Sequence, residues 1–180
     1  MTLRHGWRRA AGAVAVAALT AWGCAGITTG AYTATGANLA GYATYAWAED
    51  DDAPTGDPRL DSNPFFFGRV RTEVDEGLAA RGFARVDEGS DLLVHVHASV
   101  TQEIDTSLID QQFCVEGDCR PFVYDSGTLV VDLVDPATSR LVWRGWAEST
   151  LGEIVNDQAL MEQRIDRSVT EVMARLPGRP

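Results

Sequence analysis

Lysine is absent from the 180-residue sequence, and arginine supplies all 15 basic side chains against 26 acidic ones. Three arginines, Arg4, Arg8 and Arg9, lie at the very start, and no acidic residue precedes Glu49. The chain beyond residue 23 therefore carries 12 arginines against 26 acids, a net charge of −14. Such a surface repels phosphate backbones and anionic lipid headgroups, so we expect no nucleic-acid partner.

The sequence also lacks a long apolar run. The alanine-rich apolar stretch from Ala10 to Gly23 is shorter than the roughly 20 residues that a transmembrane helix needs. Basic residues precede this stretch and small residues follow it, which is the pattern of a signal peptide. We therefore expect residues 1–23 to direct export and to be removed.

Residues 19–24, Leu-Thr-Ala-Trp-Gly-Cys, resemble the lipobox of bacterial lipoproteins, in which the lipidated cysteine becomes the first mature residue. The resemblance implies that Cys24 carries acyl chains and that the membrane is a partner through this anchor. Ala21, where leucine is usual, and the bulky Trp22 depart from the pattern, so ordinary cleavage to a soluble periplasmic binding protein is the alternative. The residue after Cys24 is Ala25 and not an aspartate. By the same resemblance to bacterial lipoproteins, this implies an anchor in the outer membrane if the source is Gram-negative.

Cysteine is scarce, and Cys24, Cys114 and Cys119 are the three present. With Cys24 lipidated, the other two form an even pair. They flank Val-Glu-Gly-Asp, a segment suited to a tight turn, and an exported chain meets an oxidising compartment. We therefore expect a Cys114–Cys119 disulfide, because two cysteines alone are half of a zinc ligand set.

Catalytic motifs are missing as well. The sequence has no Gly-x-Ser-x-Gly elbow, and its three histidines have no obvious nucleophile, so we expect no enzyme and no cofactor. His95 and His97 are the best metal candidates, because residues two apart on a strand point the same way. A third ligand from a neighbouring strand would make a metal-dependent periplasmic enzyme, the alternative function. Two polar residues on a solvated strand face are the simpler interpretation.

A compact aromatic cluster lies in residues 141–147. Strand alternation places Trp143 on one face and Arg144 and Trp146 on the other. Large aromatic residues mostly serve cores. Arg144 and Trp146 are also residue types enriched at binding hot spots, which makes them a candidate interaction patch.

The remaining patterns predict one α+β domain over residues 42–180, after a segment, 24–41, that holds the lipidated cysteine and a tether or a first strand (27–32). Alternation predicts strands at 42–47, 83–86, 92–100, 127–134 and 141–147, the last two joined as a hairpin. One helix starts at Asn63-Pro64 with Phe67, Val70, Val74 and Leu78 on its stripe, and another is capped by Asn156 or Asp157. Residues 49–58 form a predicted solvated loop and 101–123 a polar insertion. Adjacent strands favour a mainly antiparallel sheet with two amphipathic helices packed on one face.

Residues 42–47 (Tyr-Ala-Thr-Tyr-Ala-Trp), 78–83, 91–94, 124–135 and 141–147 resemble blocks of bacterial lipoproteins called domain of unknown function 4136. The resemblance covers residues 27–176. It implies a signal peptide and often a lipid anchor, and it offers no established activity and no catalytic residues. We expect a lipid-anchored cell-envelope protein that faces the periplasm and binds or scaffolds, with another envelope protein or a small ligand as partner.

Overall fold

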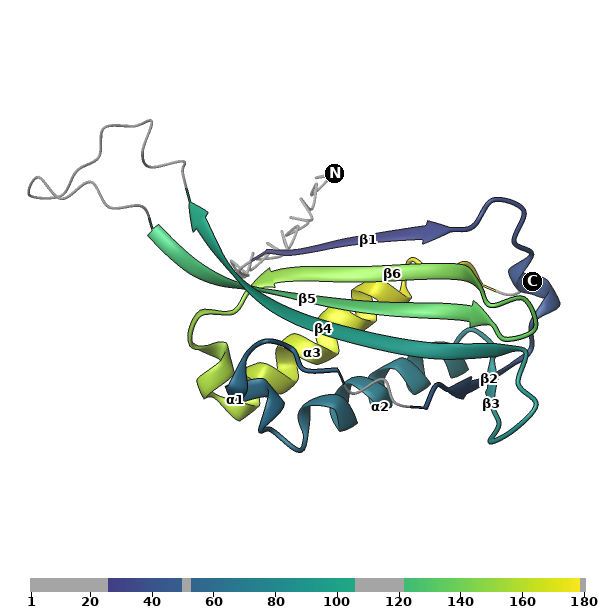
Figure 1. Cartoon of the computed structure of the whole chain (residues 1–180), viewed down its shortest axis with the longest axis horizontal. Coiled ribbons are helices and arrows are strands. Elements are labelled where there is room, and N and C mark those ends of the chain that lie inside the picture. The colour runs from purple at the N-terminus through teal and green to yellow at the C-terminus, as the bar shows by residue number, and fades with distance from the viewer. Residues whose placement is uncertain (1–25, 50–52, 106–121, 179–180) are drawn as a thin grey trace, which may run out of the picture.

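A computed structural model describes residues 26–49, 53–105 and 122–178, and in them a six-stranded sheet in the order β1-β6-β5-β4-β2-β3. The strands are β1 (Ile27–Thr33), β2 (Thr44–Trp47), β3 (Ala84–Arg85), β4 (Leu92–Asp105), β5 (Phe122–Asp135) and β6 (Arg140–Thr150). The helices are α1 (Pro58–Asp61), α2 (Phe66–Ala79) and α3 (Gln158–Met173), with 3₁₀ turns at Leu39–Gly41 and Gly152–Asn156 (Figure 1). The first four strands in the sheet order pair antiparallel, and β2 pairs parallel with β4 and β3. The predicted α+β class is confirmed.

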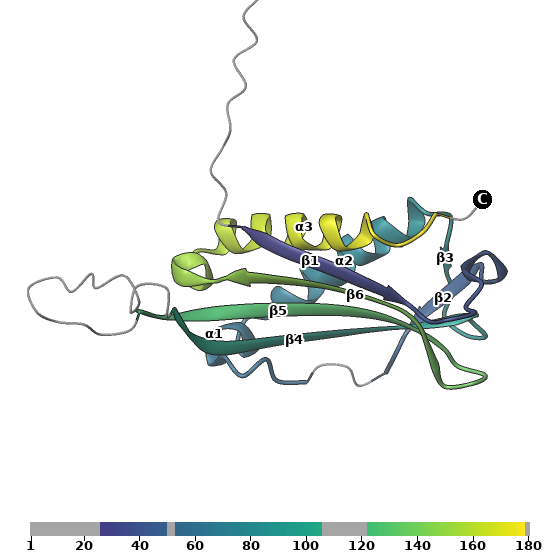
Figure 2. The same cartoon turned by 90° about the horizontal axis from the view of Figure 1, so that it is seen from above.

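Both long helices lie on the same side of the sheet (Figure 2). Each has one apolar stripe, and burying that stripe against the sheet is what stabilises an amphipathic helix. The core comprises the two stripes and the strand residues that point toward them: Val70, Val74, Leu78, Ile165, Val169, Val172, Leu92, Val94, Val131, Leu133 and Trp143.

Helix α2 begins two residues later than the predicted start at Pro64. The Asn63 side-chain oxygen accepts a hydrogen bond from the Phe65 backbone N–H at 2.9 Å, which forms a turn ahead of the helix. Phe66 is consequently buried, whereas the predicted Phe67 is only partly buried at the edge of the core. The predicted cap of α3 is confirmed for Asp157, whose carboxylate accepts from the Leu160 N–H.

Helix α1 replaces the end of the predicted solvated loop. Asp57 caps it by accepting a hydrogen bond from the Arg59 N–H at 2.8 Å, and Pro58 occupies the first helical position. Leu60 is buried against the core. The loop prediction was therefore wrong at Pro58, which starts a helix, and the predicted solvation was wrong at Thr55 and Asp57, which are 2 % and 5 % exposed.

Strands β4 and β5 continue beyond the rest of the sheet as a two-stranded arm, residues 101–105 and 122–125 (Figure 1). Strand β6 ends at Thr150, opposite Ser126, so it does not reach the arm. The predicted insertion at 101–123 is thus partly strand. Cys114 and Cys119 lie outside the described residues, and the disulfide stays a prediction.

The candidate first strand is present as β1, which pairs with β6 over seven residues from Ile27↔Ser149 to Thr33↔Trp143. Cys24 lies outside the described residues. None of the helices in the described part of the chain has the length and hydrophobicity needed to cross a membrane.

Candidate functional site

Within the part of the chain that the structure describes, no helix lies over one face of the sheet, because α2 and α3 both cover the other face (Figure 2). We call it the open face. Two cross-strand rows run over it, set by the pairing register: Tyr32, Arg144, Asp132 and His95 in the first, and Gly30, Trp146, Val130 and His97 in the second. The predicted patch residues Arg144 and Trp146 therefore share this face, and Trp143 lies fully buried in the core on the other.

In the first row, Arg144 is held flat against Asp132. Its Nε lies 2.7 Å from Asp132 Oδ1, and its Nη2 bonds Oδ2, so the pair is bidentate. Asp132 is only 5 % exposed, and the hydrogen bonds to this carboxylate raise the pKa of Arg144. Tyr32, next in the row, is 51 % exposed. The row thus presents a fixed guanidinium beside an accessible tyrosine.

In the second row, Trp146 lies across β1 at Gly30. A β-carbon at position 30 would come 2.1 Å from Cζ2 of Trp146, so the ring occupies the space that a side chain would need. Trp146 is half-buried as a result, beside the half-buried Val130. The close approach of ring and strand explains why glycine is required at position 30, a role that the sequence did not reveal.

The two candidate metal ligands lie side by side on β4. The rings of His95 and His97 are roughly parallel, with an interplanar angle of 19° and centroids 6.3 Å apart. Asp132 is the register partner of His95, but its carboxylate already binds Arg144. Among the described residues, no three His, Cys, Asp or Glu side chains are arranged to hold a metal ion. The metal site stays a prediction supported by two ligands.

A groove of about 500 Å³ continues from His95 toward β2 and the loop that follows β3. Part of its wall is apolar and comes from Ala46, Leu93 and Pro136. Three exposed acidic side chains also line it, those of Glu49, Asp87 and Glu88. The other lining residues are Trp47, Ala48, Gly89, Ser90 and His95. No basic residue lines it in the described part of the chain. Its charge therefore favours a cationic group.

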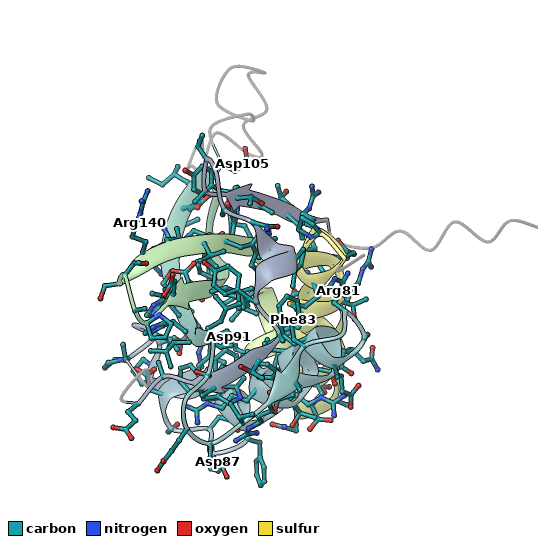
Figure 3. The ribbon with its side chains drawn as sticks, turned by 90° about the vertical axis from the view of Figure 1, so that its right-hand side faces the viewer. Arg81, Phe83, Asp87, Asp91, Asp105 and Arg140 are labelled. Carbon is teal, nitrogen blue, oxygen red and sulfur yellow. The ribbon has the colours of Figure 1, made fainter. Side chains whose placement is uncertain are left out.

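The same end of the sheet is held together by Asp91 (Figure 3). One oxygen of its carboxylate accepts hydrogen bonds from the backbone N–H groups of Ala43 and Thr44, at 2.7 and 2.9 Å, and from the Thr44 hydroxyl at 2.9 Å. Tyr42 donates to Asp135 at 3.4 Å. Three of the segments on which the family resemblance rests thus meet here, and the contacts fix how β2 enters the sheet.

A neighbouring carboxylate, Asp75 on α2, ties the helix to β2. It accepts hydrogen bonds from the Tyr45 hydroxyl at 2.7 Å and the Trp47 indole N–H at 3.0 Å. Burial and the hydrogen bond to Asp75 raise the pKa of the Tyr45 phenol, so the hydroxyl stays a donor. Tyr45 is 2 % exposed, which assigns this group to the core.

The described residues define a class: an α+β fold with an open sheet, the two long helices on one face and polar and aromatic side chains on the other. The chain belongs to the family described as domain of unknown function (DUF4136), whose model matches residues 30–178. No curated protein matches the sequence.

Solved structures share the fold at low sequence identity. A PDZ domain protein from Parabacteroides distasonis aligns with a TM-score of 0.53 and 12 % identity over 84 % of this chain, which spans only 36 % of that protein. A PelC dodecamer variant from Paraburkholderia phytofirmans aligns with a TM-score of 0.50 and 12 % identity, over 86 % of this chain and 99 % of that one. A minor lipoprotein from Acinetobacter baumannii aligns with a TM-score of 0.40 and 10 % identity, over 75 % and 92 %.

Proposed function

We propose that this protein is held in the cell envelope by a lipid on Cys24 and binds another envelope protein through the open face. The observation that carries the proposal is the uncovered sheet face with Tyr32, Arg144 and Trp146 fixed on it in adjacent rows. Aromatic and arginine side chains of this kind dominate binding energy at protein interfaces. The acidic groove beside His95 favours a partner with basic residues.

The position of β1 supports the anchor. Cys24 precedes Ile27 by three residues, and an extended chain spans at most about 3.6 Å per residue. A lipid on Cys24 would therefore sit within about 11 Å of the sheet, at the end where the arm leaves it. The surface bears a strong negative charge, so the acyl chains would have to supply the membrane affinity.

The anchor is tested by the intact mass of the mature protein from native membranes, with Cys24→Ser as the matched variant. The proposal expects a chain that starts at Cys24 with added acyl mass, and expects Cys24→Ser to leave the membrane fraction. Alkylation of Cys114 and Cys119 only after reduction would confirm the disulfide in the same sample. A native chain without acyl mass would contradict the anchor.

The binding face is tested by placing a photo-cross-linking residue at position 32 in living cells. Arg167, exposed on α3 on the covered side, is the matched control position. We expect one adduct of defined mass from position 32 and none from position 167, and we expect Arg144→Glu to abolish it. Equal adducts from both positions, or none from position 32, would overturn the assignment of the face.

A further inference from the structure

Strand β1 forms one edge of the sheet, because it ends the strand order and no described element lies beyond it (Figure 1). The Ala34 N–H donates to the Val142 carbonyl at 2.9 Å, which makes this pair a hydrogen-bonded one. Hydrogen-bonded and non-hydrogen-bonded pairs alternate along an antiparallel ladder, so Thr28, Gly30 and Tyr32 also bond β6. The residues whose backbone groups point away from the sheet are therefore Ile27, Thr29, Ala31 and Thr33.

This edge lacks the features with which proteins block strand pairing. An exposed edge is a template for another strand, and native sheets protect it with charge, proline, a bulge or a very short strand. Strand β1 has seven residues in continuous register, and neither a charged residue nor a proline occurs between Arg9 and Glu49. The opposite edge is protected, because β3 has only two residues and one of them, Arg85, pairs with Asp75 at 3.0 Å. Strand β1 is thus the edge that can accept a further strand.

We propose that β1 pairs antiparallel with β1 of a second copy of this chain, about a two-fold axis centred on Gly30. The chain beyond residue 23 carries a net charge of −14, so two copies repel each other except where they meet through an uncharged surface, which β1 provides. In this register Ile27 of each copy lies opposite Thr33 of the other. Thr29 lies opposite Ala31 in the same way, so each outward backbone group has a partner.

The side chains on the open face fit the same register. Thr28 of each copy lies opposite Tyr32 of the other, and a β-branched residue opposite an aromatic one stabilises antiparallel strands. The two copies of Gly30 face each other in a non-hydrogen-bonded pair, with α-carbons about 4.5 Å apart. Each Trp146 ring already lies across its own Gly30. The two rings therefore meet at roughly the 4.5–7 Å separation of aromatic pairs.

The register is tested with a pair of cysteines in the mature chain that carries Cys24→Ser. Thr28→Cys and Tyr32→Cys together should give a disulfide-linked dimer on oxidation, because each new cysteine faces the other type across the two-fold axis at about 4.5 Å. Either cysteine alone should give none, because two copies of the same position lie four residues apart along the strands, about 13 Å. Non-reducing electrophoresis measures the link, and the single variants control for Cys114 and Cys119.

Self-association is tested by sedimentation of the same unlipidated chain without the new cysteines. We expect its mass to rise toward twice the chain mass between about 10 µM and 1 mM, because one strand pair is a small interface. Ala31→Pro removes one outward N–H from each copy and should weaken association about tenfold, through the loss of two hydrogen bonds. Ala31→Ser keeps the N–H and should keep the dimer. An edge strand tolerates proline where the N–H faces solvent, and thermal unfolding checks that both variants fold.

A second pair of variants tests the role of charge. Ala31→Glu places a negative charge on the edge of each copy and should weaken association, because like charges on paired strands repel. Thr101→Glu adds the same charge at an exposed position of β4, three strands away in the sheet, and should leave the dimer nearly unchanged.

Three results would overturn the proposal: a mass of one chain at the highest concentration, cross-linking of a single cysteine as readily as of the pair, or equal effects of the proline and serine variants. The chain has no acyl group in these experiments, so their outcome does not depend on the anchor. The partner proposed for the open face is a different protein, and its adduct from position 32 differs in mass from two copies of this chain. Either proposal can therefore fail alone.

Discussion

Gly77 lets helices α2 and α3 approach each other closely. A β-carbon at position 77 would lie 2.6 Å from Cγ and 3.0 Å from Cβ of Met173 on α3, and Met173 is itself buried. Gly68, on the same helix, has open space where its β-carbon would be. Gly68 is the third residue of α2 and Gly77 the third from its end, and their surroundings are opposite, so their alanine variants compare an open helical position with a crowded one.

We expect Gly68→Ala to raise the free energy of unfolding by about 0.5–1 kcal/mol, the usual gain of alanine over glycine in a helix. Gly77→Ala should instead lower it by about 1–3 kcal/mol, because Met173 must move in a close-packed interface. Urea unfolding followed by circular dichroism measures both. A gain in both variants would show that the helices are less tightly packed than described.

At the scale of elements, α1 is tied to the base of the arm by charge. Arg59 bonds Asp57 through its guanidinium and reaches Asp125 at 3.0 Å, and the Leu151 N–H donates to the Asp125 carbonyl at 2.8 Å. Asp57 is 5 % exposed, and its hydrogen bond with Arg59 lowers the pKa of the carboxyl. The short helix thus depends on an ionised aspartate.

Asp57→Asn keeps a capping oxygen but removes the charge. Because the folded pKa of Asp57 lies below its unfolded value of about 4, the stabilisation is complete above about pH 4 and disappears as pH falls through the folded pKa. We expect the variant to lose about 1 kcal/mol of unfolding free energy at pH 7 and the difference to vanish in strong acid.

Unfolding curves from pH 2 to 7 measure this difference, with Glu171→Gln as the control. Glu171 pairs with Arg167 on the exposed face of α3, where a single ion pair contributes little. A pH-independent loss in Asp57→Asn would mean that the side chain acts by shape and capping alone.

Local sequence patterns predicted most of the helices and strands. The elements that these patterns did not predict depend on contacts with distant parts of the chain. The turn chemistry of residues 135–140 and the stripe on α3 were sufficient for the β5–β6 hairpin and for that helix. Helix α1 is only four residues long, too short to show a helical period. No arm side chain whose burial the structure describes is buried, so no alternation of buried apolar residues marks these strands in the sequence, and they follow instead from the ladder between β4 and β5.

The site shows the same division. Strand alternation placed Arg144, Trp146, His95 and His97 correctly relative to their own strands. The pairing register between strands places Asp132 opposite Arg144 and Gly30 opposite Trp146. The sequence of one strand does not specify its register with the next strand, so these two contacts could not be predicted.

At the scale of the whole molecule, the surplus of acids should make stability depend on salt. Beyond residue 23 the chain carries a net charge of −14, and the folded state holds these charges closer together than the unfolded chain does. Salt shortens the screening length from about 30 Å at 0.01 M to about 8 Å at 0.15 M. Isolated ion pairs on the surface contribute little stability, so we expect the screening of the net repulsion to dominate the salt dependence.

We therefore expect the melting temperature of the mature domain to rise between 10 and 150 mM sodium chloride at pH 7, as measured by scanning calorimetry. The rise should vanish below pH 4.6, the pI of the full sequence, because the mature domain lacks three of its arginines and reaches zero net charge at a lower pH. A fall in melting temperature with salt at pH 7 would show that the ion pairs outweigh the repulsion.

The pairing of β1 with β6 has a mechanical consequence if the lipid sits on Cys24. Tension between the membrane and a partner would enter the domain at Ile27 and act along the length of β1. The hydrogen bonds of an antiparallel ladder are perpendicular to the strands, so all seven register pairs would be loaded together in shear and none would be peeled first. The strand nearest the anchor is thus placed to carry load, and the arm and the open face would stay in place while it does.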